Sequence, residues 1–249
     1  MIYGAFADVY DRLMDDYDYD SWAEYYLQLL SRGVSPDRPL HIVECACGTG
    51  SLSVRFAKAG CFVTGMDASS AMLRIAEEKA RQFGVDLQLA CCDMRRFCVT
   101  RPVDAVLATC DGVNYLLSEK DVCSFFQCAR KALRPRGVLC FDFSTRYKLE
   151  ELVGDHFLGE ERNGLAYLWQ NRPDFSRHVI TMDLTCFVRE DDGRYRRFRE
   201  THRQRAHSTE EITGCLEQTG FSDIELFGEM RFDGPKRKDT RIHARAVAV

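Results

Sequence analysis

Short apolar runs alternate with amphipathic stretches through the middle of the chain, and this alternation indicates its architecture. The apolar runs predict strands, and the stretches with apolar residues at helical spacing predict helices. The expected strands cover 40–45, 61–66, 86–90, 103–108 and 137–143, and the expected helices cover 52–58, 69–83 and 119–133. Continuous apolar strands separated by helices are typical of a parallel sheet covered on both faces. The pattern therefore predicts an α/β domain.

The alternation breaks between residues 145 and 206. There the pattern predicts three strands, at 165–170, 178–188 and 195–205, joined by turn sequences. Consecutive strands with short connections form antiparallel sheets. We therefore expect 145–206 to be an inserted β lid on the substrate side, with 1–144 and 207–249 forming the main domain. A helix beginning at Ser208, where Glu211 completes a capping box, and strands at 223–228 and 241–248 follow the insertion.

Residues 1–35 are rich in aromatic and acidic side chains. Helical spacing from Ser21 onward predicts a helix capped by Asp20 or Ser21, and Tyr3, Phe6 and Tyr10 precede it. Two interpretations of this N-terminal cap stay open. It is either an arm that folds over a bound ligand or a loosely held terminus.

Composition narrows the class of protein. The 249 residues suit one large domain with an insertion, and a net charge of −4 argues against a nucleic-acid partner. No apolar stretch is long enough to span a bilayer, and the first residues lack a secretory signal, so we expect a cytoplasmic protein without a membrane partner. The 12 cysteines lie mostly in apolar segments without paired zinc-type spacing, so we expect reduced structural thiols and no metal.

The segment 42–51 carries the clearest candidate chemistry. An apolar strand ends at Glu44, and the small residues Ala46, Gly48 and Gly50 form a turn that opens a helix. Such a turn lets a ligand approach the backbone and presents free N–H groups to anionic groups. The next apolar strand ends at Asp67, where a carboxylate can accept hydrogen bonds from both hydroxyls of a ribose. Together these features indicate a site for a nucleoside-type cofactor.

The spacing of this turn differs from the G-x-G-x-x-G of dinucleotide enzymes. It resembles motif I of the class I S-adenosylmethionine-dependent methyltransferases, E/D-x-G-x-G-x-G, with Ala46 in place of the first glycine. The resemblance covers most of the chain and continues in 63–69, 92–94, 104–107 and 133–139. It implies S-adenosyl-L-methionine as cofactor. It also implies a Rossmann-like, mostly parallel seven-stranded sheet in the order 3-2-1-4-5-7-6, with an antiparallel last strand.

The resemblance also implies roles for individual residues. Glu44 would orient the methionyl ammonium, Asp67 would bind the ribose, and Asp93 would accept from the adenine amino group while the Met94 N–H serves a ring nitrogen. The expected cofactor-binding residues are Glu44, Ala46, Gly48, Gly50, Asp67, Ala68, Met72, Asp93, Met94, Thr109 and Cys110.

The acceptor side is less defined by sequence. The expected substrate-side residues are Tyr10, Asn114, Tyr115, Arg199 and Arg203. The basic strand at 195–205 would hold an anionic acceptor if its arginines faced the pocket, whereas a solvated charged face is the alternative. No catalytic residue is defined, and His202 and Tyr115 are the candidates. If one face of the basic strand closes on the pocket, His202 and His207 could act as a base near neutral pH.

We therefore predict an enzyme that transfers a methyl group to a small molecule by in-line displacement. One alternative is a tRNA or rRNA methyltransferase, which would need a continuous basic surface. A second alternative is a non-catalytic S-adenosylmethionine-binding protein. The exposed strand edges of the insertion also leave open a homodimer contact in place of a lid.

Overall fold

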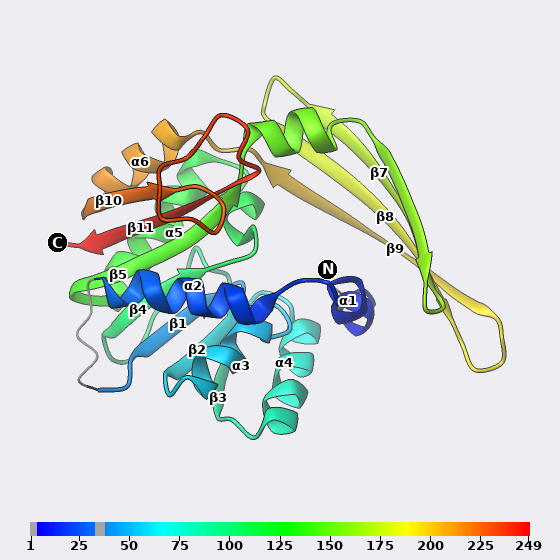
Figure 1. Ribbon diagram of the computed structural model, residues 1–249, viewed down its shortest axis with the longest axis horizontal. Helices are drawn as coiled ribbons and strands as arrows, with labels where there is room; N and C mark the ends of the chain where they lie inside the picture. The colour runs from blue at the N-terminus through cyan, green and yellow to red at the C-terminus, as the bar shows by residue number, and fades with distance from the viewer. Residues whose placement is uncertain (1–3, 33–37) are drawn as a thin grey trace.

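The computed structural model describes residues 4–32 and 38–249, and Tyr3 lies outside them. These residues form two sheets (Figure 1). The first is a seven-stranded sheet in the order β10-β11-β5-β4-β1-β2-β3. Its strands are β1 (His41–Cys45), β2 (Phe62–Asp67), β3 (Leu87–Cys91), β4 (Val103–Ala108), β5 (Leu133–Ser144), β10 (Phe221–Phe227) and β11 (Arg241–Ala248).

The strand order implied by the sequence resemblance is confirmed. β1 pairs in parallel with β2 and β4, and β11 runs antiparallel to both β5 and β10. In this arrangement the carboxyl ends of β1, β2 and β4 meet at one edge, which is where open α/β sheets bind their ligands.

Helices cover both faces of the first sheet, because its strands carry apolar residues on both sides. α2 (Tyr19–Ser31) and α3 (Ser51–Lys58) pack with Ile42, Val63 and Leu107. α5 (Glu119–Ala132) and α6 (Thr209–Gln218) pack on the opposite face with Val43, Val106 and Leu139. α4 (Ser70–Phe83) lies beside α3 and β3. None of the described helices is long and apolar enough to cross a membrane.

The second sheet is antiparallel and lies within the predicted insertion. Its strands are β6 (Phe157–Arg162), β7 (Leu165–Asp174), β8 (Val179–Arg189) and β9 (Tyr195–Arg205). It follows the π-helical turn η2 (Tyr147–Val153). Val9 of the short helix α1 (Ala7–Leu13) and Phe6, which precedes this helix, pack on the inner face of the second sheet, so that α1 lies between this sheet and α4 (Figure 1).

The structure corrects several details of the sequence interpretation. The insertion has four strands, because β6 was not predicted, and α1 and η2 were not predicted either. Helix α2 begins at Tyr19 and is capped by Asp18, whose side chain accepts from the Ser21 N–H, instead of by Asp20 or Ser21. The capping box of Ser208 and Glu211 is confirmed. Cys123 and Cys215 form a disulfide between α5 and α6, so the expectation of reduced thiols is wrong for this pair.

Candidate functional site

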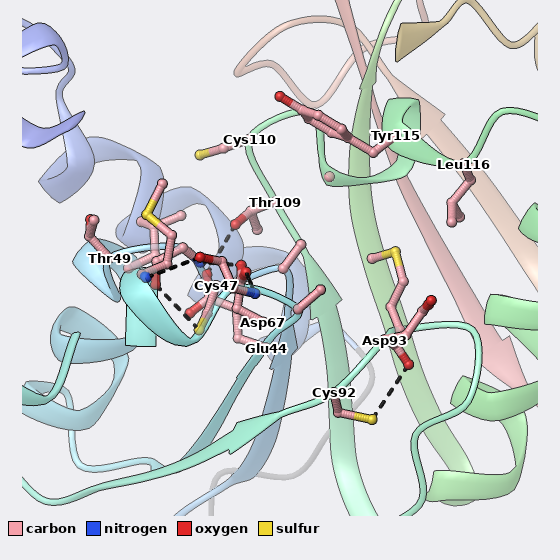
Figure 2. A pocket seen from close by; sticks show the side chains of 18 of the residues that line it. Glu44, Cys47, Thr49, Asp67, Cys92, Asp93, Thr109, Cys110, Tyr115 and Leu116 are labelled. Carbon is pink, nitrogen blue, oxygen red and sulfur yellow. Dashed lines mark hydrogen bonds between the residues drawn. The ribbon is translucent and has the colours of Figure 1, made fainter. Parts of the chain in front are cut away.

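A pocket of about 560 Å³ lies at the carboxyl ends of β1, β2 and β4 (Figure 2). All but one of the residues expected to bind the cofactor line this pocket, namely Glu44, Ala46, Gly48, Asp67, Ala68, Met72, Asp93, Met94, Thr109 and Cys110. The exception is Gly50. Tyr10 and Tyr115 line the pocket as well. The carboxyl ends of neighbouring strands bring together side chains that lie far apart along the chain.

The turn after β1 explains why Gly50 is absent from the pocket wall. Gly50 caps α3 with φ at 72°, and a Cβ added there would lie 2.9 Å from the Ala76 Cβ. Its small size therefore lets α4 pack closely against the start of α3. Gly48, with φ at 55°, lines the pocket and donates its N–H to Asp67 Oδ2 at 2.9 Å.

Ala46 has a left-handed backbone, with φ at 53°. This conformation costs an L-residue about 1–2 kcal/mol and suits glycine. The Ala46 methyl group lies close to Gly112, where an added Cβ would come within 3.1 Å of it. Ala46 therefore meets both the pocket and the loop after β4, and a larger side chain would clash with that loop.

Glu44 is a fully buried carboxyl group at the base of the pocket. Thr109 Oγ1 donates to its Oε1 at 3.1 Å (Figure 2). Ser53 Oγ donates to its Oε2. Burial raises the pKa of Glu44 to about 7, against the effect of these hydrogen bonds. A cation bound beside this group would favour its charged form. The site therefore fits the positively charged methionyl end expected of the cofactor.

Asp67, at the end of β2, is the second carboxylate in the wall of the pocket. Its Oδ1 accepts from the Ser69 N–H at 2.8 Å, and its Oδ2 accepts from Gly48. Burial raises the pKa of Asp67 from its ordinary value. Each carboxylate oxygen can accept a further hydrogen bond, so Asp67 keeps acceptor capacity for a pair of ribose hydroxyls.

A second cavity of about 280 Å³ adjoins the first, between α1 and the inner face of the second sheet. The two cavities share Tyr10, Cys110 and Tyr115. Aromatic side chains form much of the wall of the second cavity, and the residues used below are Phe6, Trp169, His202, Gln204, Asp111, Lys148 and Arg241.

Tyr115 and His202 form a polar pair at the junction of the two cavities. Tyr115 Oη lies 3.3 Å from His202 Nδ1, and His202 Nε2 lies 3.7 Å from Glu200 Oε2. Burial lowers the pKa of His202 below 6.5, so its imidazole is neutral near pH 7. A neutral imidazole in this position can accept a proton through the Tyr115 hydroxyl.

Gln204 was missed by the sequence analysis. Its side chain is 8% exposed, it lines the second cavity, and its amide makes no hydrogen bond with the part of the chain that the structure describes. A buried amide ordinarily has hydrogen-bond partners, so one facing a cavity indicates a polar ligand. The signal in the sequence was its place on the same side of β9 as His202.

The wall between the cavities is held by charged residues that the sequence analysis also missed. Cys110 and Asp111 both have left-handed backbones, and both donate their N–H groups to Asp142, at 2.7 and 3.0 Å. Arg241 pairs with Asp142 and lies 2.8 Å from Asp111 Oδ1. The sequence signal was a carboxylate within the apolar run that ends β5, and a guanidinium at the first residue of β11.

Three residues expected on the substrate side lie outside both cavities. Asn114 is fully buried, and its amide bonds to the backbone of Ser144 and Arg205. It therefore joins β5 to β9 and forms no part of the cavity wall. Arg199 and Arg203 are exposed on the outer face of the second sheet, because side chains alternate along β9 and His202 takes the inner face. These arginines therefore lie away from both cavities, and a role in holding an acceptor stays a prediction that this geometry does not support.

Known proteins resemble this chain along its whole length. Residues 42–137 match a family described as a methyltransferase domain. A protein of Geobacillus sp. (strain WCH70), named as a candidate methyltransferase, is 33% identical over 97% of this chain and 98% of its own. The crystal structure of an S-adenosylmethionine-dependent methyltransferase from Clostridium acetobutylicum ATCC 824 matches with a TM-score of 0.88 and 26% identity, over 99% of this chain and 98% of the other.

A more distant structure shares the fold. It is CalS10 from Micromonospora echinaspora, described as an amino pentose methyltransferase with S-adenosylmethionine bound. The TM-score is 0.72 at 18% identity, and the match covers 100% of this chain and 98% of the other.

Proposed function

The chain belongs to the class I S-adenosylmethionine-dependent methyltransferases, and we propose that it methylates a small molecule held in the second cavity. The observation that carries this proposal is the shared wall of the two cavities. Tyr115 and Cys110 line both, so an acceptor in the second cavity lies beside a cofactor in the first. The amide of Gln204, which is buried and makes no hydrogen bond to the described residues, supports a polar ligand there.

Several observations favour a small acceptor over a nucleic acid. A cavity of about 280 Å³ between α1 and the second sheet accommodates a small molecule. Arg199 and Arg203 face away from it. A fold shared with an enzyme described as an amino pentose methyltransferase agrees with a small acceptor.

The charges of the cavity argue against an anionic acceptor. Lys148 and Arg241 both pair with Asp111, at 3.3 and 2.8 Å. Arg241 also pairs with Asp142, so the two cations among the described lining residues of this cavity are balanced by two carboxylates. We propose that the acceptor is a neutral or cationic molecule without an anionic group. A nitrogen or a hydroxyl group of this molecule would accept the methyl group.

The cofactor would be held by the residues of the first cavity. Glu44 would face its ammonium, Asp67 its ribose and Asp93 its adenine. When bound, S-adenosylmethionine supplies an electrophilic methyl group on a sulfonium. The protein's own task is then to place the acceptor, exclude water and remove a proton.

The Tyr115–His202 pair performs the proton transfer in this proposal. As the acceptor loses its proton to Tyr115 Oη, the Tyr115 hydroxyl proton passes to His202 Nδ1. The imidazolium that forms is stabilised by the carboxylate of Glu200, 3.7 Å away. His202 and Tyr115 are therefore the catalytic residues of the proposed reaction.

The test offers the purified protein S-adenosylmethionine together with panels of amines, alcohols, phenols and carboxylates, and measures S-adenosylhomocysteine formation. We expect turnover of amines or hydroxyl compounds. His202→Gln and Tyr115→Phe should each lower kcat by roughly a hundredfold, whereas Arg203→Gln should not. The kcat of the unmodified protein should rise with pH through a pKa below 6.5, and His202→Gln should flatten that rise. Methyl incorporation into tRNA or rRNA alone, or cofactor binding without turnover, would contradict the proposal.

A further inference from the structure

Arg95 connects two walls of the first cavity. Its guanidinium donates to both carboxylate oxygens of Asp93, from Nε to Oδ1 at 3.0 Å and from Nη2 to Oδ2 at 2.6 Å. Its remaining nitrogen, Nη1, donates to Asp121 Oδ1 at 2.8 Å. All three residues line the cavity. Arg95 thus ties the loop after β3 to the first turn of α5.

Both ends of this connection are fixed. The Arg95 N–H donates to Asp93 Oδ1 at 2.9 Å, which sets the carboxylate against its own loop. At the other end, Ser118 caps α5, and its hydroxyl donates to Asp121 Oδ2 at 2.8 Å. A planar guanidinium matches a carboxylate in a fixed, bidentate geometry. Arg95 therefore determines the direction in which the remaining lone pairs of Asp93 point.

We propose that Arg95 is a positioning residue that makes this end of the cavity selective for a purine bearing an amino group over one bearing an oxo group. Asp93 stands apart from Glu44 and Asp67 (Figure 2), where the base of the cofactor would lie. An ionised carboxylate only accepts hydrogen bonds. The amino group of adenine donates to it, whereas the oxo group of hypoxanthine would place two acceptors against each other.

The charge state of Asp93 supports this selectivity. Hydrogen bonds from Arg95 hold the pKa of Asp93 below its ordinary value, so it stays ionised at every physiological pH. A protonated carboxyl group could donate to an oxo group, and the selectivity would be lost. Arg95 therefore contributes both the direction and the charge of the acceptor. The inference concerns the cofactor site, so it does not depend on the proposed methyl acceptor.

The experiment compares two ligands by calorimetry: S-adenosylhomocysteine and its deaminated analogue S-inosylhomocysteine, which differ only at the purine. The unmodified protein should bind the adenosyl compound about a hundredfold more tightly, because a site built for a donor rejects an analogue that lacks it. Arg95→Gln should reduce this ratio to about fivefold or less, mainly by weakening the adenosyl compound. Arg95→Lys keeps the positive charge but loses the planar guanidinium that donates two hydrogen bonds to Asp93, so its ratio should be intermediate.

The matched control is Arg96→Gln. Arg96 is exposed on the same loop, and only its backbone N–H bonds to Asp93, to the carbonyl at 2.9 Å. Among the described residues the carboxylate takes its hydrogen bonds from Arg95, so Arg96→Gln loses the same charge and should keep the full ratio. Thermal unfolding verifies that each variant is folded. The inference is overturned if the unmodified protein does not discriminate between the ligands, if Arg95→Gln keeps the ratio, or if it weakens both ligands equally. The last result would mark Arg95 as a structural residue alone.

Discussion

At the residue scale, the pocket concentrates backbone strain and buried charge around a few positions. Ala46 occupies a left-handed conformation beside Gly112. Glu44, two residues earlier on β1, is buried, and its pKa is raised to about 7. Both departures from ordinary protein chemistry occur where the cofactor would contact the chain. Strain and shifted pKa values gather at functional sites because the surrounding structure holds them in place.

The raised pKa of Glu44 gives the cofactor affinity a defined pH dependence. Below pH 7 the group is protonated, and a cationic cofactor must displace that proton, so affinity should fall by up to about tenfold per pH unit below 7. Calorimetry with S-adenosylmethionine from pH 5.5 to 8.5 measures this slope. Glu44→Gln should bind more weakly at pH 8 and lose the slope. If the affinity of the variant still fell with pH in the same way, the proton that competes with the cofactor would belong to another group.

The same shift bears on the stability of the ligand-free protein. Because the folded pKa lies above the ordinary value of 4.5, the folded state binds the proton more tightly than the unfolded state. The contribution of Glu44 to stability is therefore fully present below pH 4.5 and is lost as the pH rises through about 7.

Replacing Ala46 tests the strain directly. Ala46→Gly should raise the free energy of unfolding by about 1 kcal/mol, because glycine adopts the left-handed region without steric cost. Ala46→Val should lower it by about 2 kcal/mol, because a β-branched residue is disfavoured there and its added methyl groups would meet Gly112. Urea unfolding measures both. An unchanged or reduced stability of Ala46→Gly would show that the alanine is not strained.

Residues contributed by a local motif were predictable, and residues contributed by distant pairing were not. Glu44 and Asp67 lie at the ends of apolar strands, so their place in the wall of the first cavity followed from the order of elements. Asp142 and Arg241 come together because β5 and β11 pair side by side, and this pairing places Asp142 where it accepts from the Cys110 N–H. No pattern along the chain specifies that register.

At the element scale, the pattern along the chain predicted β9 but not β6. Alternation along β9 correctly divided its residues between two faces, but it did not indicate which face would line the cavity. β6 escaped prediction because it is an edge strand beside β7 and is exposed over almost its whole length, which leaves no apolar alternation to detect. α1 is too short for its periodicity to stand out from that of a loop.

The two faces of β9 should differ sharply in function. Gln204→Leu keeps the size of the side chain but removes its polar atoms, so the KM of the acceptor should rise about tenfold. Arg203→Gln, on the outer face of the same strand, should change it by less than about twofold. Steady-state kinetics with whichever acceptor is identified compares them. Equal effects from both variants would mean that the acceptor does not occupy the second cavity.

At the scale of the whole molecule, α1 joins the two sheets across both cavities. Toward the first sheet, Asp11 accepts from Thr49 Oγ1 at 2.7 Å and pairs with Lys79 at 2.8 Å. Toward the second sheet, Arg12 donates to the Asn163 carbonyl at 2.7 Å. Tyr10 of this helix lines both cavities, so we expect a shift of α1 to change the shape of each of them.

Loosening α1 at its cofactor side should weaken ligand binding without unfolding the protein. Asp11→Asn removes the charge that pairs with Lys79, whose side chain is 13% exposed, although the asparagine oxygen can still accept from Thr49. The hold on α1 should weaken by about 1 kcal/mol. Hydrogen exchange of 7–13 should then quicken while that of the seven-stranded sheet stays unchanged, and cofactor affinity should fall several-fold. Asp8→Asn is the control, because Asp8 and its partner Arg74 are 49% and 51% exposed, and such surface pairs contribute little. If both variants behave alike, α1 is held by the apolar contacts of Phe6 and Val9 alone, and Asp11 does not fix it over the cofactor.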